Sequence, residues 1–531
     1  MFFDKCFSRR CAVTFFVVCF FFLGCCVRLY SIASGGLRRV QEQQSSLRLP
    51  LVRERGTVFD RNMLPLNNQS EKVIAAVSPV PRAVVAISNA LKGSDELEGI
   101  LERLSSGKPI VCVLPQKIEC DGIVCLNTKI PHVKEQAAEH IIGYLDSSGH
   151  GVSGIEKAFD SILYSEKTVD AIFKTDGMGR VLEGEEIELE GVGNAVGNAV
   201  VTTLDINIQT IAEKAALEID RGAVVIADAQ NGEIRALVSK PSFDCTRISD
   251  YLDRPDSPLL NRALSAFNVG SAFKPCVAAA GLEKNIGNLL YKCSGSVTIA
   301  DRAFKCHKAA GHGALGLSGA LAESCNVFFY RFSKVVGADA VYETASNLGF
   351  GTSFEIANGI SCSAGALTSR TELESLSALA NLSIGQGKLL ASPVAMLNLY
   401  CAIAGDGSYR VPSIVSAAFE QGEKSEYDKS SPTKAFSKQT AKTIRSALVE
   451  VIENGTGKSA KPALCTAAGK TATAQTGVYE NNKEITNGWF CGFFPAEVPK
   501  YVVIIMEEKA IGSDVSPIFA RIADEITEND F

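Results

Sequence analysis

The feature that most constrains the fold of this chain is an unbroken apolar run near its N-terminus, residues 11–27. Its length is at the short end of what a membrane-spanning helix needs. Lys5, Arg9 and Arg10 precede the run, which predicts a cytoplasmic N-terminus, although Arg28 follows closely on the other side. Since no second apolar run in the sequence reaches spanning length, we expect the rest of the chain to lie outside the membrane.

Two other interpretations of this segment remain open. Ser31-Ile-Ala33 resembles a signal-peptidase site, and Phe22-Leu-Gly-Cys25 is an imperfect lipoprotein box. We predict an uncleaved anchor, in which residues 1–34 are the cytoplasmic tail and transmembrane helix of a single-pass protein of the cell membrane. The polar and basic residues 35–50 predict a stalk.

Three short motifs follow in one order and at wide spacing: Ser271-Ala-Phe-Lys274, Ser324-Cys-Asn326 and Lys470-Thr471-Ala472. Each alone is weak evidence, because Ser105-Ser-Gly-Lys108 and Ser431-Pro-Thr-Lys434 repeat the first pattern. Together the three resemble the S-x-x-K, S-x-N and K-T-G set of penicillin-binding proteins and serine β-lactamases. That set builds one active site around a serine nucleophile.

The first motif stands at the start of a predicted helix. Residues three apart share a helix face, so Ser271 and Lys274 can meet. Proline is tolerated in a first turn, where its missing N–H breaks no bond, so Pro275 predicts a helix that begins at about Ser271. The serine would then lie at the positive end of the helix, which favours developing negative charge. The apolar residues 276–282 predict that this helix is buried.

The resemblance implies roles for the polar residues of these motifs. Lys274 would take the proton of Ser271, which requires a neutral amine. Burial and a nearby cation both lower the pKa of a lysine, and Lys470 is the expected cation. Ser324 would relay a proton between the two lysines.

Substrate binding is expected from the second and third motifs. Asn326 would offer its amide to the substrate backbone, and the hydroxyls of Thr471 and Thr473 would bind a substrate carboxylate. The backbone N–H groups of Ser271 and Thr473 would form the oxyanion hole. Ala472 departs from the family's glycine, which lets a ligand approach a strand closely. We expect activity to persist, with a difference in drug affinity or substrate fit.

Further signatures extend the resemblance over nearly the whole chain, to the class B penicillin-binding proteins. This resemblance implies a D,D-transpeptidase that cross-links peptidoglycan stem peptides and is acylated by β-lactams. It also implies a SEDS-type glycosyltransferase as the partner in the membrane. A carboxypeptidase, a β-lactamase and a non-catalytic sensor or assembly protein remain alternatives. The signatures are Arg55-Gly-Thr-Val-Phe-Asp-Arg61, Gly151-Val-Ser-Gly-Ile-Glu156, Gly311-His-Gly313, Ser383-Ile-Gly-Gln-Gly387 with Pro393, Gly455-Thr-Gly457 and Trp489-Phe-Cys-Gly492.

The order of strand and helix patterns predicts an α+β fold. Residues 35–198 are expected to form the stalk and a pedestal domain of the dimerisation type, and residues 199–531 the transpeptidase domain. Two early and three late strand patterns with helices between them predict a five-stranded antiparallel sheet flanked by helices. These strands are residues 222–227 and 233–238, joined through Asn231-Gly232, then 465–476, 488–494 and 501–506. Residues 517–525 predict a closing helix capped by Ser516.

Composition and motif content argue against several other classes of function. A net charge of −6 gives no sign of nucleic-acid binding, and no H-E-x-x-H zinc pattern occurs. Seventeen cysteines are unusual for an exported protein, and most are expected to be small buried hydrophobes. Of the possible disulfides, the sequence favours Cys293 with Cys306, since both lie in the loop region before Ser324. With His307 and His312 they also offer zinc ligands, but this spacing matches no familiar zinc module, so we predict no metal and no cofactor.

Overall fold

The computed structural model describes residues 3–34, 46–67, 71–129, 134–176, 178–192, 197–427 and 430–529. The chain divides into two compact units. The first contains residues 1–54, 70–130 and 165–195, and the second contains residues 55–69, 131–164 and 196–531. Residues 35–45 of the predicted stalk lie outside the described residues.

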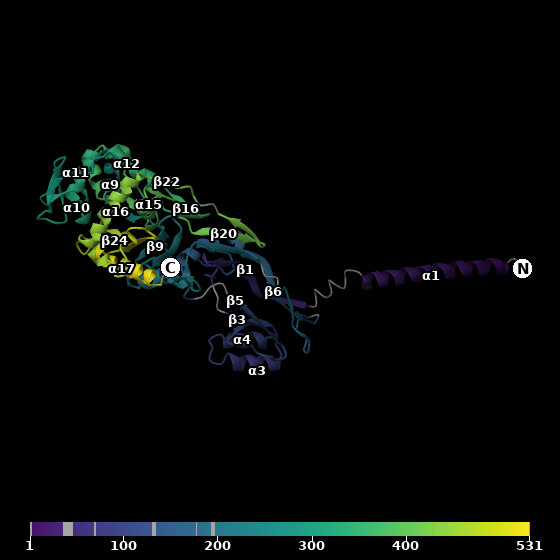
Figure 1. Ribbon diagram of the computed structural model, residues 1–531. Helices are drawn as coiled ribbons and strands as arrows, with labels where there is room; N and C mark the ends of the chain where they lie inside the picture. Colours follow the sequence, from purple (N-terminus) through teal and green to yellow (C-terminus); the bar gives the residue numbers. More distant parts are fainter. Residues whose placement is uncertain are drawn as a thin grey trace. The chain divides into compact units, whose positions relative to one another are not determined.

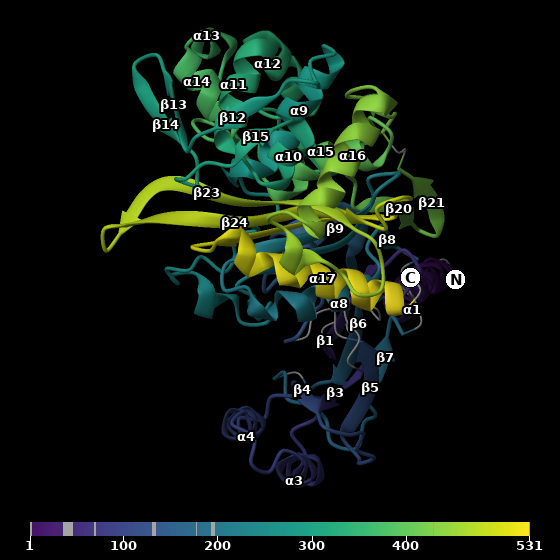
Figure 2. The same ribbon diagram turned by 60° about the vertical axis from the view of Figure 1, so that its left-hand side comes forward.

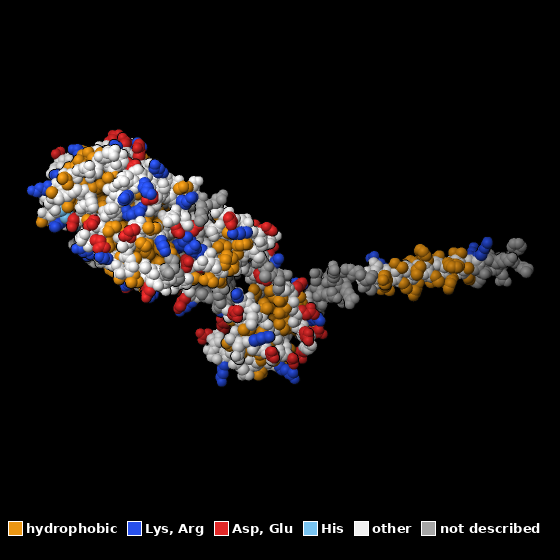
Figure 3. Space-filling view, in the orientation of Figure 1, with side chains coloured by type: hydrophobic (Ala, Val, Ile, Leu, Met, Phe, Trp, Pro, Cys, Tyr) orange, Lys and Arg blue, Asp and Glu red, His pale blue; other side chains and the backbone are white. Residues whose placement is uncertain are grey.

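Helix α1 (Phe3–Ser34) contains the N-terminal apolar run. Its stretch Arg9–Ile32 is long and apolar enough to cross a membrane, and among the described residues it is the one helix that is. Hydrophobic side chains cover the described part of this helix, with arginine side chains towards both of its ends (Figure 3). A helix that exposes apolar residues all round is compatible with a single membrane span, because such a surface is stable in lipid and not in water.

The rest of the first unit is built on two small sheets, of strand order β4-β3-β5 and β1-β6-β7 (Figure 1). Side chains alternate along β3, so that Ala75 and Val77 pack with α3, while Ile74 and Ala76 pack with β6. Both faces of β3 are therefore covered. The elements are β1 (Ser46–Arg55), β3 (Glu71–Val77), α3 (Pro81–Ala90), α4 (Leu97–Ser105), β4 (Ile110–Leu114), β5 (Ile123–Lys129), β6 (Tyr164–Lys174) and β7 (Glu188–Glu190).

The second unit is organised around the predicted five-stranded antiparallel sheet, and its strand order is β10-β9-β25-β24-β23. The α+β fold with this sheet is confirmed. The two early strands are joined through Asn231-Gly232, and Gly232 has a φ of +73°, which glycine adopts at no steric cost. The strands are β9 (Gly222–Asp228), β10 (Ile234–Lys240), β23 (Ala468–Glu480), β24 (Lys483–Phe494) and β25 (Tyr501–Glu508).

Helices cover both faces of this sheet (Figure 2). Val224 and Ile226 of β9 belong to the apolar cluster that includes α8 and α17, whereas Val225 and Ala227 belong to the cluster that includes α9, α15 and α16. The near-continuous apolar sequence of β9 is explained by this double burial. The helices are α8 (Ile206–Ala215), α9 (Lys274–Glu283), α10 (Leu317–Ala322), α11 (Asn326–Val336), α12 (Ala338–Asn347), α14 (Leu376–Ser383), α15 (Pro393–Ala404), α16 (Lys438–Glu453) and α17 (Gly512–Glu528).

A buried ion pair joins two of the signatures quoted from the sequence. The side chain of Arg55 donates to Glu156 Oε2 at 2.7 Å and to Asp160 Oδ1 at 3.0 Å. It lies where β1 ends, before the sheet β2-β8-β20-β21, while Glu156 and Asp160 lie on short helices. The side chains of Arg55 and Glu156 are 6% and 0% exposed, so water cannot replace this pair. The elements are β2 (Thr57–Phe59), α5 (Glu139–Ile142), α6 (Gly154–Ala158), α7 (Asp160–Leu163), β8 (Ala199–Thr202), β20 (Val415–Glu420) and β21 (Glu423–Glu426).

Two expectations from the sequence were wrong. Helix α17 begins at Gly512, so that Pro517 lies inside it and Ser516 does not cap it. Burial of the apolar side of α17 against the sheet offsets the helical hydrogen bond that this proline removes. The thiols of Cys293 and Cys306 are free, and no disulfide joins them. They lie in a pair of hairpins with strands β12 (Tyr291–Cys293), β13 (Ser296–Ile299), β14 (Arg302–Lys305) and β15 (Gly313–Leu315).

Candidate active site

Ser271 lies in a 3₁₀ turn, Gly270–Phe273, that leads directly into α9. The α-helix thus begins at Lys274, just after the start that the sequence predicts. Because a 3₁₀ helix has three residues per turn, side chains three apart project from the same side, which places Ser271 and Lys274 on one face. Ser271 is partly exposed, whereas Ala272 and Phe273 are fully buried. The turn therefore presents one hydroxyl to solvent on a rigid apolar base.

A glycine allows this turn to lie against the edge of the sheet. Gly270 has a φ of +62°, and a Cβ added there would come within 3.0 Å of the Cβ of Ala474 on β23. Its N–H donates to Gly385 O at 2.9 Å. Gly385 belongs to one of the quoted family signatures, and here it meets Gly270 beside the nucleophile motif.

Two aromatic residues also hold the turn, and the sequence had assigned a role to neither. The hydroxyl of Tyr400 donates to Ala272 O at 3.0 Å, and Trp489 Nε1 donates to Asn268 O at 2.8 Å. Both side chains are fully buried. Trp489 is the one tryptophan of the chain, but a local pattern could not reveal which carbonyl its indole would reach.

Lys274 is fully buried, and its ammonium group contacts the second motif. It donates to Ser324 O at 2.7 Å, to Ser324 Oγ at 3.2 Å and to Asn326 Oδ1 at 2.7 Å. The ring of Phe329 lies beside it, with its centroid 5.5 Å from Nζ. Burial lowers the pKa of Lys274 to about 7, because a medium of low dielectric disfavours the charged form. The amine can therefore act as a base near neutral pH.

The backbone of Ser324 explains how its hydroxyl reaches Lys274. Ser324 has a φ of 52°, in the left-handed region. Its N–H donates to Leu321 O at 3.2 Å, and the N–H of Cys325 donates to Ala320 O at 2.9 Å, which is the Schellman ending of α10. Glycine is the usual residue at this position. The serine is retained at a cost of about 1–3 kcal/mol of strain, a cost that is typical of functional sites.

Lys470 lies on β23, at the edge of the sheet, and is fully buried. Its Nζ donates to Thr471 O at 3.0 Å. Burial, and then the charge of Lys274, lower its pKa well below the ordinary value. The sequence predicts that burial and the charge of Lys470 both lower the pKa of Lys274, and burial is the cause found there. Burial is the larger cause for both residues, because each has lost its water shell.

The side chains of β23 alternate between two faces. Lys470, Ala472 and Ala474 lie on one face and are buried, and Ala472 is 3% exposed. On the other face, Thr471 Oγ1 lies 3.0 Å from Thr456 Oγ1, and Thr473 Oγ1 accepts a hydrogen bond from Gly512 N at 3.0 Å.

Two consequences follow from this arrangement. Thr456 belongs to one of the signatures, but the sequence assigned it no role. Its hydroxyl lies beside that of Thr471, one of the two threonines predicted to bind a carboxylate. The edge position of β23 leaves backbone groups of that strand available to a ligand.

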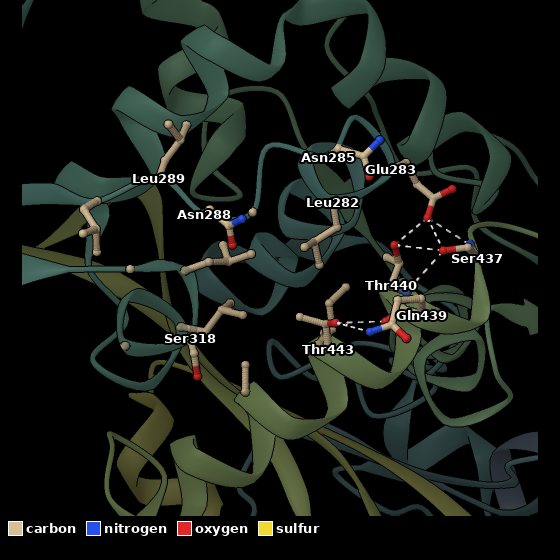
Figure 4. Close-up of a pocket in the computed structure, with 18 residues that line it drawn as sticks. Leu282, Glu283, Asn285, Asn288, Leu289, Ser318, Ser437, Gln439, Thr440 and Thr443 are labelled. Carbon is tan, nitrogen blue, oxygen red and sulfur yellow. Dashed lines mark hydrogen bonds between the residues drawn. The ribbon is translucent and has the colours of Figure 1, made fainter.

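A cavity in the described residues lies away from these motifs. It has a volume of about 790 Å³ and is lined by the C-terminal end of α9 and by α16. None of the predicted site residues lines it. In Figure 4, Glu283 accepts hydrogen bonds from Ser437 and Thr440, which satisfies polar groups at the start of α16. We therefore assign the chemistry to the motif residues and not to this cavity.

Comparisons with known proteins agree with this geometry. The family profile of the penicillin-binding protein transpeptidase domain matches residues 222–528. Stage V sporulation protein D of Bacillus subtilis is 28% identical over 514 residues, which cover 88% of this chain and 76% of the relative. The probable peptidoglycan D,D-transpeptidase PenA of Neisseria gonorrhoeae is 27% identical over 502 residues, 85% of this chain and 79% of the relative.

Solved structures share the fold. Penicillin-binding protein 3 of Mycobacterium tuberculosis superposes with a TM-score of 0.66 at 24% identity, over 91% of this chain and 97% of that one. A D,D-transpeptidase domain from Eggerthella lenta superposes with a TM-score of 0.65 at 25% identity, over 90% of this chain and 99% of that one. The chain therefore belongs to the penicillin-binding protein transpeptidase family, and its enzyme class is that of the peptidoglycan D,D-transpeptidases.

Proposed function

We propose that the chain is a membrane-anchored serine D,D-transpeptidase that cross-links peptidoglycan stem peptides through an acyl-enzyme on Ser271. The observation that carries the proposal is the buried ammonium group of Lys274, which follows Ser271 by one 3₁₀ turn and is hydrogen-bonded to both Ser324 and Asn326. With a pKa of about 7, this amine is neutral in a large fraction of molecules near neutral pH.

Acylation begins when neutral Lys274 takes the hydroxyl proton of Ser271. The serine oxygen attacks the carbonyl of the penultimate D-Ala, and the backbone N–H groups of Ser271 and Thr473 stabilise the developing oxyanion. The amide bond then breaks as its nitrogen receives a proton, relayed from Lys274 through the Ser324 hydroxyl 3.2 Å away. The terminal D-Ala leaves, and the ester remains on Ser271.

Cross-linking completes the cycle. An amine on a neighbouring stem peptide attacks the ester carbonyl while its proton passes to Lys274. A new amide bond forms, the ester bond breaks, and the proton returns to the oxygen of Ser271. Asn326 and the threonines of β23 orient the peptide, because an amide and two hydroxyls suit a backbone and a terminal carboxylate.

A β-lactam would enter the same path and stop at the ester. Penicillin-binding protein 3 of Mycobacterium tuberculosis has been solved in complexes with aztreonam and ampicillin. By analogy, we propose that Ser271 opens the lactam ring and that the bulky adduct excludes the second amine.

We further propose that α1 crosses the cell membrane once, with the N-terminus in the cytoplasm, as the basic residues before the apolar run suggest. Residues 199–531 would then act outside the membrane as the transpeptidase domain, with residues 35–198 as stalk and pedestal. A SEDS-type glycosyltransferase partner stays a prediction.

The test is covalent labelling of the full-length protein in detergent with a fluorescent penicillin, followed by mass spectrometry of the adduct. We expect a stable adduct on Ser271 in the wild type and none in Ser271→Ala. Ser431→Ala is the matched control, because it removes the serine of a second S-x-x-K pattern and should label fully.

Other outcomes would change the assignment. Rapid loss of the adduct would point to a β-lactamase, and release of free D-Ala without cross-links would point to a carboxypeptidase. A folded protein that gives no adduct would refute the serine mechanism.

A further inference from the structure

Four metal-ligand side chains meet beside the second motif. Their ligand atoms all lie within 4.8 Å of one another. Three of the residues come from the hairpins before α10, and the fourth is the residue that precedes α11. We call these residues the Cys₃His cluster, and they are Cys293, Cys306, His312 and Cys325.

We propose that the Cys₃His cluster is a structural zinc site. Three thiolates and one imidazole form a ligand set that binds zinc in tetrahedral structural sites without an open position. The cysteines are 3%, 7% and 0% exposed, and the side chain of His312 is 1% exposed. A closed and dry ligand set of this kind suits a structural ion and leaves no room for a substrate.

The distances fit the proposed ion. With Zn–S of about 2.3 Å and Zn–N of about 2.0–2.1 Å, a sulfur and a nitrogen in a tetrahedron lie about 3.6 Å apart. Cys306 Sγ and His312 Nδ1 are separated by 3.6 Å. Two sulfurs in such a site lie about 3.8 Å apart, so even the widest pair in the cluster would need to close by only about 1 Å.

The other nitrogen of His312 supports the same orientation. His312 Nε2 is buried and has no hydrogen-bond partner among the described residues. Glu323 Oε2 lies 4.0 Å from it. When Nδ1 binds a metal, Nε2 carries the proton, and metal-bound histidines usually donate this proton to a carboxylate or carbonyl. A small movement of Glu323 would supply that acceptor.

The hairpins around the cluster bury few side chains, and the apolar ones that pack on the main core are only partly buried. Between Tyr291 and Leu315, Cys293 and Cys306 are the only residues other than glycine that are buried when backbone and side chain are taken together. Gly311 has a φ of +78°, and a Cβ added there would come within 2.2 Å of Cys293 O. The backbone therefore closes tightly around the thiols. Small segments without a core of their own are commonly held by a metal.

The sequence by itself suggested a different fourth ligand, His307, which is close to Cys306 and His312 along the chain. His307 is exposed, and its Nδ1 lies 3.9 Å from Cys306 Sγ, but it is not part of the cluster. Cys325 takes its place, since the end of α10 brings this residue back towards the hairpins.

The site would also position catalytic residues, a consequence that rests on the proposed function. Cys325 stands between Ser324 and Asn326, and both of these hold the ammonium group of Lys274. A bond from zinc to Cys325 would fix the strained backbone at Ser324. The sulfur itself touches no substrate, so Cys325 is a positioning residue.

The first experiment measures metal in the full-length protein, purified in detergent under anaerobic, reducing conditions. We expect about one zinc per chain by elemental analysis, and zinc X-ray absorption that fits three sulfurs at about 2.3 Å and one nitrogen at about 2.0 Å. After exchange with Co²⁺, thiolate-to-metal charge-transfer absorption and tetrahedral d–d bands should appear.

Variants then test each ligand. His312→Gln and Cys325→Ser should lose the zinc, whereas the matched control His307→Gln should keep it. Glu323→Gln should weaken zinc binding by about 10- to 100-fold, as outer-sphere substitutions usually do. If Cys325→Ser does not fold, the Co²⁺ spectrum of the wild type still decides the question.

Three results would overturn the proposal. They are a folded wild type without zinc or Co²⁺ thiolate bands, an intact mass that shows a disulfide within the cluster, and zinc loss in His307→Gln equal to that in His312→Gln. Penicillin labelling is measured on the same samples. Zinc retained without labelling would refute the serine mechanism and leave the metal site standing, and labelling without zinc would do the reverse.

Discussion

The ammonium nitrogen of Lys274 lies 2.7 Å from the amide oxygen of Asn326. This contact joins the first residue of α9 to the first residue of α11. It connects two motifs that are far apart in sequence.

Replacing Lys274 should remove the base while keeping the packing. Lys274→Met retains most of the volume of the side chain, and we expect acylation by penicillin to slow by about 10²- to 10⁴-fold, the usual contribution of a general base. Lys442→Met is the matched control, because Lys442 is exposed on α16 and begins a second Lys-Thr pair. Stopped-flow or gel-based labelling gives both rates, and equal rates would contradict the role of Lys274.

Acylation should depend on pH through the same residue. Burial lowers the pKa of Lys274 to about 7, and the reactive form is the neutral one. The rate should therefore rise about tenfold per pH unit below 7 and level off above it. A profile of the acylation rate constant from pH 5 to about 9 measures this. A rate that falls with rising pH across neutrality would show that the charged form is required.

Glycine at position 324 should separate stability from activity. Ser324 has a φ of 52°, where glycine avoids strain, so Ser324→Gly should be more stable than Ser324→Ala by about 1 kcal/mol. Both variants lose the hydroxyl that lies 3.2 Å from Lys274 and should acylate slowly. Denaturant unfolding and penicillin labelling give the two readouts. Full activity in either variant would exclude the proton relay.

The Ala472→Gly substitution tests the departure from the family motif. The methyl group is buried on the face of β23 that also carries Lys470 and Ala474, and Ala474 is the residue of this strand that contacts Gly270. Removing it should lower the free energy of unfolding by about 0.5–1 kcal/mol, since glycine weakens a strand. It should also raise acylation by penicillin, by up to about tenfold, the value of one methyl group in a pocket. Loss of stability without a gain in rate would give the methyl a packing role alone.

The Arg55–Glu156 pair should be a major contribution to the stability of the second unit. Glu156→Gln leaves the buried guanidinium undercompensated and should lower the free energy of unfolding by about 3 kcal/mol. Glu480→Gln removes a partner of Lys509 in a largely exposed pair and should cost less than about 1 kcal/mol. Denaturant titration of the full-length protein compares the two. Similar losses would show that burial does not govern the first pair.

Local sequence patterns predicted much of the architecture. The Asn231-Gly232 turn, the alternating strands and the apolar run of α1 each depend on neighbours within a few residues. Such features can be predicted without knowledge of the fold. The start of α17 could not be predicted in this way, because burial of Val515 and Ile518 against the sheet outweighs the cost of Pro517 inside the helix.

The sequence by itself determined which residues are the candidates for the chemistry: two serines, two lysines and an amide at motif spacing. Only the tertiary structure decided how they meet. It buries Lys274 and Lys470 and so lowers their pKa values. It also turns Ser324 into a left-handed conformation and brings Cys325 to the other thiols. Burial and long-range proximity arise from packing between elements that are distant in the chain, and no local pattern encodes them.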